Sequence, residues 1–265
     1  MAERKEHGTV RIFCGLTGDA NGIAAAVTNE RGGVIATAEV TDDPYGYLAL
    51  CRMWVRHSDL ASVTVADNGG SRVLRALAAA AGQSIGITDV PHISDPMDSA
   101  VHIAQMLAYG DLITGVDSGA SAELRKLLTS THALINSEYA AVASFMEVIR
   151  QCHPAVLAAW DEPTDTVALE ILRIMPDPAE AAETSPQRIA EALGDIAEPT
   201  RLAEQVHKLA RAAASRTRQP RPDAGVAGAI SAASESVLAA ERAAYALATS
   251  ITEHMEVMGQ GASIP

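Results

Sequence analysis

The stretch TVRIFCGLTGDANGIAAAVTNERGGVIATAEV (Thr9–Val40) holds three apolar runs that are separated by turn residues. The first run ends in glycine and aspartate, and the glycine-rich turn NERGG separates the second run from the third. Two apolar runs on either side of a short glycine-containing turn are typical of a β-hairpin. The stretch therefore predicts three consecutive strands, of which the last two pair as a hairpin.

After these strands the predicted elements alternate. Helical spacing of Tyr47, Leu50, Cys51 and Trp54 predicts a helix, and the later segments ASVTVADNGG, SRVLRALAAAAG, QSIGITDVP and ISDPMDSAVHIAQML predict strand, helix, strand and helix. Three strands followed by alternating helices and strands are typical of a mixed sheet with flanking helices. We therefore predict an α/β domain over residues 8–115.

The remainder of the chain reads as helical. Residues 116–218 contain a long amphipathic segment, AELRKLLTSTHALINSEYAAVASFMEVIRQC, and several shorter helical segments. In residues 223–258, apolar residues recur at alternating spacings of three and four, which is a heptad pattern. We expect a long coiled-coil helix that joins two copies of the chain in a homodimer, and a loose tail over 259–265. The residues of this seam that we expect to make the dimer contact are Ile230, Val237, Leu247 and Ile251.

Composition limits the possible functions. Apolar residues make up 48% of the chain but aromatic residues only 3%, and the formal net charge is −13. So acidic a chain is not a general nucleic-acid coat, because phosphate binding depends on lysine and arginine. A nucleic-acid contact would need a local basic patch, and the densest one consists of Arg211, Arg216, Arg218 and Arg221.

The cysteines and the hydropathy suggest where the protein works. The three cysteines have no C-x-x-C spacing, which disfavours a disulfide framework and a structural zinc site. No apolar run reaches the roughly 18 residues of a membrane span, and the first residues lack the apolar core of a signal peptide. We expect a cytoplasmic protein without a membrane partner.

Asp95 and Asp98 stand three residues apart at the start of the predicted helix ISDPMDSAVHIAQML. Carboxylates at this spacing share one helix face, and their oxygens suit Mg²⁺. Alternatively, Asp95 caps the helix, Pro96 occupies its first position and Asp98 complements the helix dipole. Both interpretations remain open from the residues alone.

Taken in order, these motifs resemble the IS-one-ten insertion-sequence transposases, the family that includes the pilin-gene invertase. The resemblance covers about residues 9–258 and rests on Gly15-Leu16-Thr17, VTVADNGG, SDPMDSAVHIAQML, ELRKLLTSTHALINSEY, MPDPAEA and the heptad helix. It implies an RNase H-like, RuvC-like first domain with a D-E-D-D carboxylate quartet. It also implies a nucleic-acid partner, which is DNA or a structured RNA.

The sequence departs from the family pattern at two of the four quartet positions. In the best register, Thr17 and Ala66 stand where the family has its first aspartate and its glutamate, whereas Asp95 and Asp98 match the last two positions. The family also continues into a domain with a serine nucleophile, for which we expect no counterpart before Pro265. The resemblance therefore implies a catalytically degenerate or domesticated transposase fragment that needs no cofactor.

Two other hypotheses remain. If the alignment to the family pattern is shifted by two residues at Thr17, Asp19 takes the first quartet position, and a shift of one residue at Ala66 brings in Asp67. The chain would then be an active Mg²⁺-dependent transposase or recombinase. Alternatively, RIAEALGDIAEPTRLAEQVHKLA resembles a helix-turn-helix, with Arg201, Glu204 and Lys208 as its only long polar candidates for base contacts. That pattern predicts a transcriptional regulator, although a packed helical hairpin has the same spacing.

Overall fold

The computed structural model describes residues 10–18, 22–88, 95–110, 121–177, 191, 193, 199–214 and 224–261. The chain divides into two compact units, one of residues 1–136 and 243–265 and one of residues 137–242. The long helices α4 (Ala122–Cys152) and α10 (Ala224–Gly261) each contribute to both units. This division differs from the boundaries near residues 115 and 218–223 that the sequence suggested.

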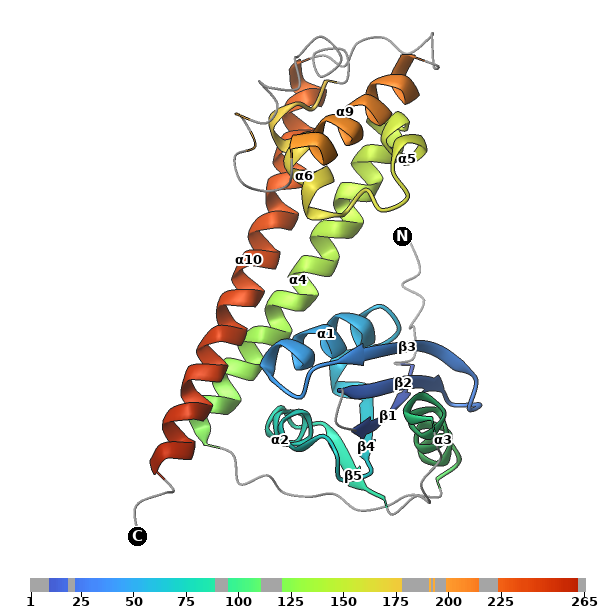
Figure 1. Cartoon of the computed structure of the whole chain (residues 1–265), viewed down its shortest axis with the longest axis vertical. Coiled ribbons are helices and arrows are strands. Elements are labelled where there is room, and N and C mark those ends of the chain that lie inside the picture. Colours follow the sequence, from blue (N-terminus) through green and yellow to red (C-terminus); the bar gives the residue numbers. More distant parts are fainter. Residues whose placement is uncertain are drawn as a thin grey trace, which may run out of the picture. The chain divides into compact units, whose positions relative to one another are not determined.

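The first unit contains a five-stranded mixed sheet with the strand order β3-β2-β1-β4-β5 (Figure 1). β1 (Ile12–Gly18) pairs antiparallel with β2 (Ile23–Asn29), and β2 pairs antiparallel with β3 (Val34–Val40). β4 (Val63–Asp67) lies parallel to β1 on one side and to β5 (Ser84–Ile87) on the other. The predicted three-stranded opening and the mixed sheet are confirmed.

Three helices flank this sheet in the predicted order. α1 (Pro44–Val55) follows β3, α2 (Arg72–Ala80) connects β4 with β5, and α3 (Pro96–Tyr109) comes after β5. Local signals explain their ends: the Asp43 carboxylate accepts a hydrogen bond from the Gly46 amide at 2.8 Å, and Gly110 ends α3 at a φ of 78°. A short 3₁₀ turn, Leu60–Ser62, precedes β4.

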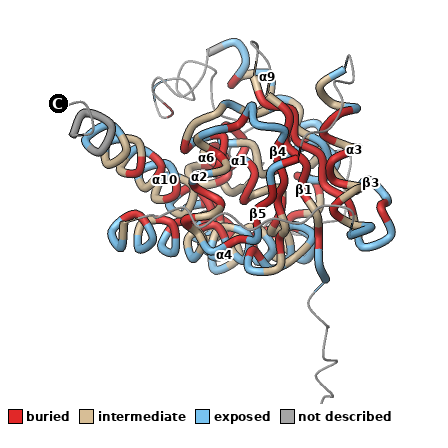
Figure 2. Tube along the Cα trace, turned by 90° about the horizontal axis from the view of Figure 1, so that it is seen from below, coloured by how far each residue is buried: buried red, intermediate tan, exposed pale blue. Residues whose placement is uncertain are grey.

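The main core of the first unit lies between the sheet and helices α1 and α2. Figure 2 shows buried segments along β1 and β4. The even-numbered residues of β1 pack there with α1 and α2, and residues from the first half of α4 and the last part of α10 join them. Members of this cluster include Ile12, Cys14, Leu16, Val65, Leu50, Trp54, Leu74, Leu77, Leu128 and Ile251.

The opposite sheet face is covered by α3 and is built from small residues. Ala24 and Ala26 of β2 contact Ala100 of α3, and the Thr28 hydroxyl donates to the Ala104 carbonyl oxygen at 3.1 Å. Small side chains let the helix backbone approach the strands closely. These contacts therefore hold α3 against the sheet and set the position of its first turn.

The second unit is helical. The second half of α4 and the first half of α10 pack with α5 (Ala155–Ala159), α6 (Thr166–Ile174) and α9 (Pro199–Ala214). The long helices, α6 and α9 agree with the sequence-based prediction, whereas α5 was not predicted. The segment RIAEALG, which begins the helix-turn-helix hypothesis, lies mostly outside the described residues. Within the described parts of the chain, no helix is long and apolar enough to cross a membrane.

Candidate functional site

Thr17 and Ala66, which the family resemblance aligned with the first two quartet positions, both face α3. Gly15 of β1 packs against α3 so closely that a β-carbon there would lie 2.1 Å from the Ala100 carbonyl oxygen. Because side chains alternate along a strand, Thr17 points to the same face as Gly15. Ala66 pairs with Gly15 in the sheet register and packs with Ile103 of α3.

Asp95 begins α3 as its N-cap. One of its carboxylate oxygens accepts hydrogen bonds from the Met97 amide at 2.7 Å and the Asp98 amide at 3.2 Å. Pro96 occupies the first helical position, and Asp98 lies exposed in the first turn. The capping interpretation of Asp95 is therefore confirmed, and one of its oxygens is committed to the helix backbone.

These four positions do not fit a Mg²⁺ ion. The ion requires a nearly octahedral set of oxygen ligands, usually including carboxylates. Thr17 offers a buried hydroxyl without a hydrogen-bond partner among the described residues, and Ala66 offers no ligand. Among the residues that the structure describes, no group of three or more His, Cys, Asp or Glu side chains is arranged to hold a metal. Asp19 lies outside the described residues.

Asp67 points to the other face of the sheet. It pairs with Leu16 in the register and follows Val65 by two residues, so its side chain lies on the face covered by α1 and α2. The fully buried carboxylate forms an ion pair with Arg75 at 2.8 Å and accepts a hydrogen bond from the Ser71 amide at 3.1 Å. This placement does not support Asp67 as a substitute metal ligand.

A second acidic contact at α2 was not predicted. The Asp42 carboxylate accepts hydrogen bonds from the Val73 amide at 3.0 Å and the Leu74 amide at 2.9 Å, although it lies about thirty residues earlier in the chain. Ser71 precedes α2, but its side chain makes no capping hydrogen bond. The neighbouring residues Asp42 and Asp43 therefore accept hydrogen bonds from the first turns of two helices, Asp43 from α1 and Asp42 from α2.

Burial in the main core disfavours the nucleophilic thiolate form of Cys14 and Cys51. Burial raises the pKa of the Cys14 thiol to about 12 and also raises the pKa of Cys51 well above its usual value. The Tyr47 hydroxyl lies 2.8 Å from His132 Nε2 and 3.2 Å from Gln83 Oε1. Burial lowers the pKa of His132, so its imidazole is neutral near pH 7.

The predicted basic patch is only partly within the described residues. Arg211 lies exposed in the last turn of α9, whereas Arg216, Arg218 and Arg221 lie outside the described residues. On the same helix, Lys208 forms an ion pair with Glu204 at 3.2 Å. That pairing engages two of the three long polar side chains that the helix-turn-helix hypothesis requires for base contacts, and Arg201 remains exposed.

The predicted dimer seam on α10 is covered by α4 of the same chain. In the second unit, Ile230 and Val237 are buried in one cluster with Phe145 and Ile149 of α4. In the first unit, Ile251 is buried with Leu124 and Leu128, and Leu247 is half-buried. The heptad stripe is thus buried without a second copy, and the homodimer stays a prediction.

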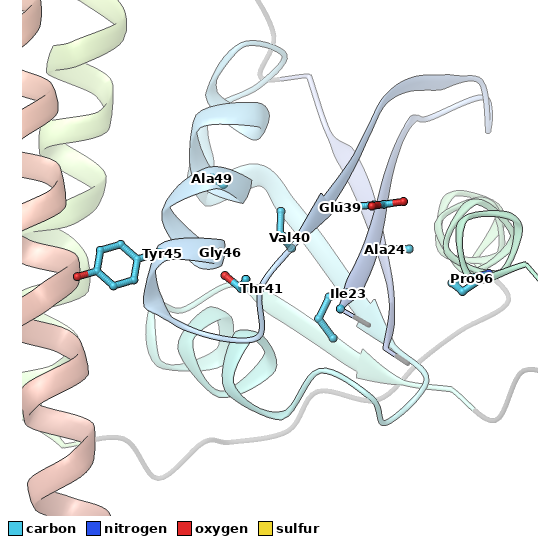
Figure 3. Close-up of a pocket in the computed structure, with 10 residues that line it drawn as sticks. Ile23, Ala24, Glu39, Val40, Thr41, Tyr45, Gly46, Ala49 and Pro96 are labelled. Atoms are coloured by element: carbon cyan, nitrogen blue, oxygen red, sulfur yellow. The ribbon is translucent and has the colours of Figure 1, made fainter. Parts of the chain in front are cut away.

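An aromatic surface and a hollow in the first unit have no counterpart in the sequence analysis. Tyr45 of α1 and Tyr245 of α10 are 40% and 44% exposed, with ring centroids 6.2 Å apart. Tyr45 also lines a hollow of about 620 Å³. The described residues that line the hollow are Gly22, Ile23, Ala24, Glu39, Val40, Thr41, Tyr45, Gly46, Ala49 and Pro96 (Figure 3).

No protein-family model, curated protein or solved structure matches this chain.

Proposed function

We propose that the chain is a transposase-related nucleic-acid-binding protein, of the DNA transposition and recombination type, that has lost catalysis. Its first unit would be RuvC-like, that is, RNase H-like, and related to the IS-one-ten transposases. The strand order β3-β2-β1-β4-β5 supports this, because an antiparallel three-stranded opening followed by two parallel strands gives the element order of RNase H-like folds.

One observation carries the catalytic part of the proposal. Thr17 and Ala66 share the sheet face on which α3 packs, and neither brings a charge to it. Two-metal phosphodiester chemistry requires several carboxylates that converge on the ions. Asp95 is engaged as a helix cap and Asp67 is paired with Arg75, whereas Asp98 lies exposed in the first turn of α3, where its charge complements the helix dipole.

Nucleic-acid binding would depend on local positive charge because the whole chain carries a formal charge of −13. The cluster Arg211, Arg216, Arg218 and Arg221 concentrates four guanidinium groups within eleven residues. Each phosphate that such a cluster neutralises releases condensed counterions, which makes the affinity depend on salt.

Fluorescence anisotropy with a labelled duplex DNA tests this proposal. We expect binding that weakens steeply with salt, and a shallower salt dependence after the four arginines of the cluster are replaced by glutamine. A control variant carries glutamine at four exposed basic residues elsewhere, Arg31, Arg72, Arg125 and Lys126, and changes the net charge equally. An equal loss of DNA affinity in both variants would contradict the assignment of binding to the arginine cluster. Mg²⁺-dependent cleavage of the DNA would contradict the loss of catalysis.

A further inference from the structure

The strand β3 forms one edge of the sheet and is the least buried of the described strands. None of the residues in Val34–Val40 is buried, whereas each of the other four described strands contains buried residues. Among the described strands only β2 pairs with β3, so every second residue of β3 directs its backbone N–H and C=O groups away from the sheet. Such a row of backbone groups is a template for a further strand.

Two of the common features that block an open edge, lysine and proline, are missing from β3. Its sequence is VIATAEV, in which Glu39 is the only charged residue. A bulge between Val27 and Thr28 of β2 interrupts the register near the start of β3, but the register is continuous from Ala36 to Val40. Residues 36–40 are therefore regular enough to pair with an added strand.

The two sheet faces beside this edge differ in character. Glu39 pairs with Ala24 in the register and therefore lies on the face that α3 covers, and its exposed carboxylate points toward α3 in Figure 3. That carboxylate forms no ion pair among the described residues. Val40 pairs with Ile23 on the opposite face, where α1 lies. An added strand would place successive side chains alternately on these two faces.

The α1 face at the end of β3 is hollowed and mostly apolar. On this side the hollow of about 620 Å³ is lined by Ile23, Val40, Ala49 and the ring of Tyr45. Tyr45 and Ala49 are both exposed, and their spacing of four places them on one face of α1. An apolar side chain next to Val40 on an added strand would therefore enter the hollow, whereas the following side chain would lie on the Glu39 face.

We propose that β3 binds an extended peptide of a protein partner, which adds to the sheet as a further strand and alternates basic with apolar side chains. Backbone hydrogen bonds to residues 36–40 supply affinity, and the alternate side chains supply specificity. A lysine or arginine beside Glu39 complements its charge, and the apolar side chains on the other face occupy the hollow. A second copy of β3 fits less well, because it brings another glutamate and no basic residue to the edge. This surface is independent of the arginine cluster and of DNA binding.

The test uses fluorescence anisotropy of a fluorescein-labelled peptide, Thr-Lys-Val-Lys-Val-Lys-Thr, with the full chain. Glu39→Lys should weaken binding about fivefold or more, because a favourable charge pair across the two strands becomes a repulsive one. Glu30→Lys changes the net charge equally at an exposed residue of the turn between β2 and β3, and should leave the affinity within about twofold. A peptide with glycine in place of valine should bind about fivefold more weakly or worse, because no apolar side chain enters the hollow.

Two further measurements test the strand addition itself. A peptide with the same side chains but a methyl group on every backbone amide cannot pair with β3 and should not bind detectably. Hydrogen–deuterium exchange should show that the unmethylated peptide protects amides of β3 and leaves those of α9 unchanged.

Three results would overturn the proposal: equal losses in Glu39→Lys and Glu30→Lys, binding of the methylated peptide, or unprotected β3 amides in the complex. Protection of β3 that rises with protein concentration in the absence of the peptide would also overturn it, and would assign the edge to a second copy of the chain.

Discussion

The backbone of Gly15 lies directly against α3, where a β-carbon would come within 2.1 Å of the carbonyl oxygen of Ala100. Nothing larger than glycine fits without displacing the helix backbone. The contact fixes α3 on β1 and therefore fixes the first turn, with Asp95 and Asp98, relative to Thr17 and Ala66. Movement of α3 closer to the strands cannot compensate for the missing carboxylates.

Gly15→Ala should lower the free energy of unfolding by about 2 kcal/mol or more, because overpacking at backbone atoms forces the helix to shift. Urea unfolding followed by circular dichroism measures the change. Gly228→Ala is the control: its β-carbon meets nothing within 4 Å, and alanine favours a helix interior. A Gly15→Ala variant as stable as wild type would contradict the close packing of α3.

Asp95→Ala should destabilise the protein by roughly 1 kcal/mol, because two amides of α3 lose their acceptor. Asp95→Asn retains a capping oxygen and should restore most of that loss. Asp98→Ala removes an exposed side chain and should change the unfolding midpoint little. If Asp98→Ala were instead the more damaging change, Asp98 would have a structural partner that the cap does not explain.

Stability should fall in mildly acidic solution because of His132. Burial lowers the pKa of His132 in the folded protein, partly offset by Asp59, so the unfolded chain binds the proton more readily. The contribution of neutral His132 to the free energy of unfolding is fully present above the pKa of the unfolded chain, about 6.5, and is lost as the pH falls below that value. The imidazole contacts the neutral Tyr47 hydroxyl, which also donates a hydrogen bond to Gln83 Oε1.

Urea unfolding at pH 7.5 and pH 5.5 measures this dependence. Wild type should lose more stability between the two values than His132→Gln, which cannot gain a proton. The exposed residue His102 supplies the control, and His102→Gln should follow wild type. An unchanged pH dependence in His132→Gln would assign the effect to other groups.

Ile251→Ala should lower the free energy of unfolding by about 2–4 kcal/mol, because the side chain is 1% exposed within the core of the first unit. The 71% exposed Val257 provides a control on the same helix, and Val257→Ala should have little effect. Sedimentation should be unchanged by Ile251→Ala, because α4 already covers the seam. A heavier species that this substitution converts to a lighter one would instead favour the homodimer through α10.

Local patterns predicted the parts of the fold that depend on neighbouring residues. The glycine turn between β2 and β3 and the cap at Asp95 each act over a few positions, so the sequence displays them. Contacts between distant residues could not be predicted in this way. Asp42 reaches the start of α2 from a loop about thirty residues away, and no spacing rule marks that contact.

The candidate site shows the same limit. Sequence spacing makes Asp67 a possible replacement for a carboxylate at Ala66, but a shift of one residue turns the side chain to the opposite face of the sheet. Only the register of β4 against β1 reveals that Asp67 faces the α1 and α2 side. For α10, the heptad spacing predicts a buried stripe but does not distinguish a second chain from α4 of the same chain.

The most direct test of the central claim is calorimetric titration of the full chain with Mg²⁺ and with Mn²⁺. We expect only heats of dilution, because Thr17 and Ala66 supply no charge and Asp67 is paired with Arg75. A saturable site that Asp98→Asn abolishes would contradict that claim, and would show that the chain still assembles a catalytic metal centre.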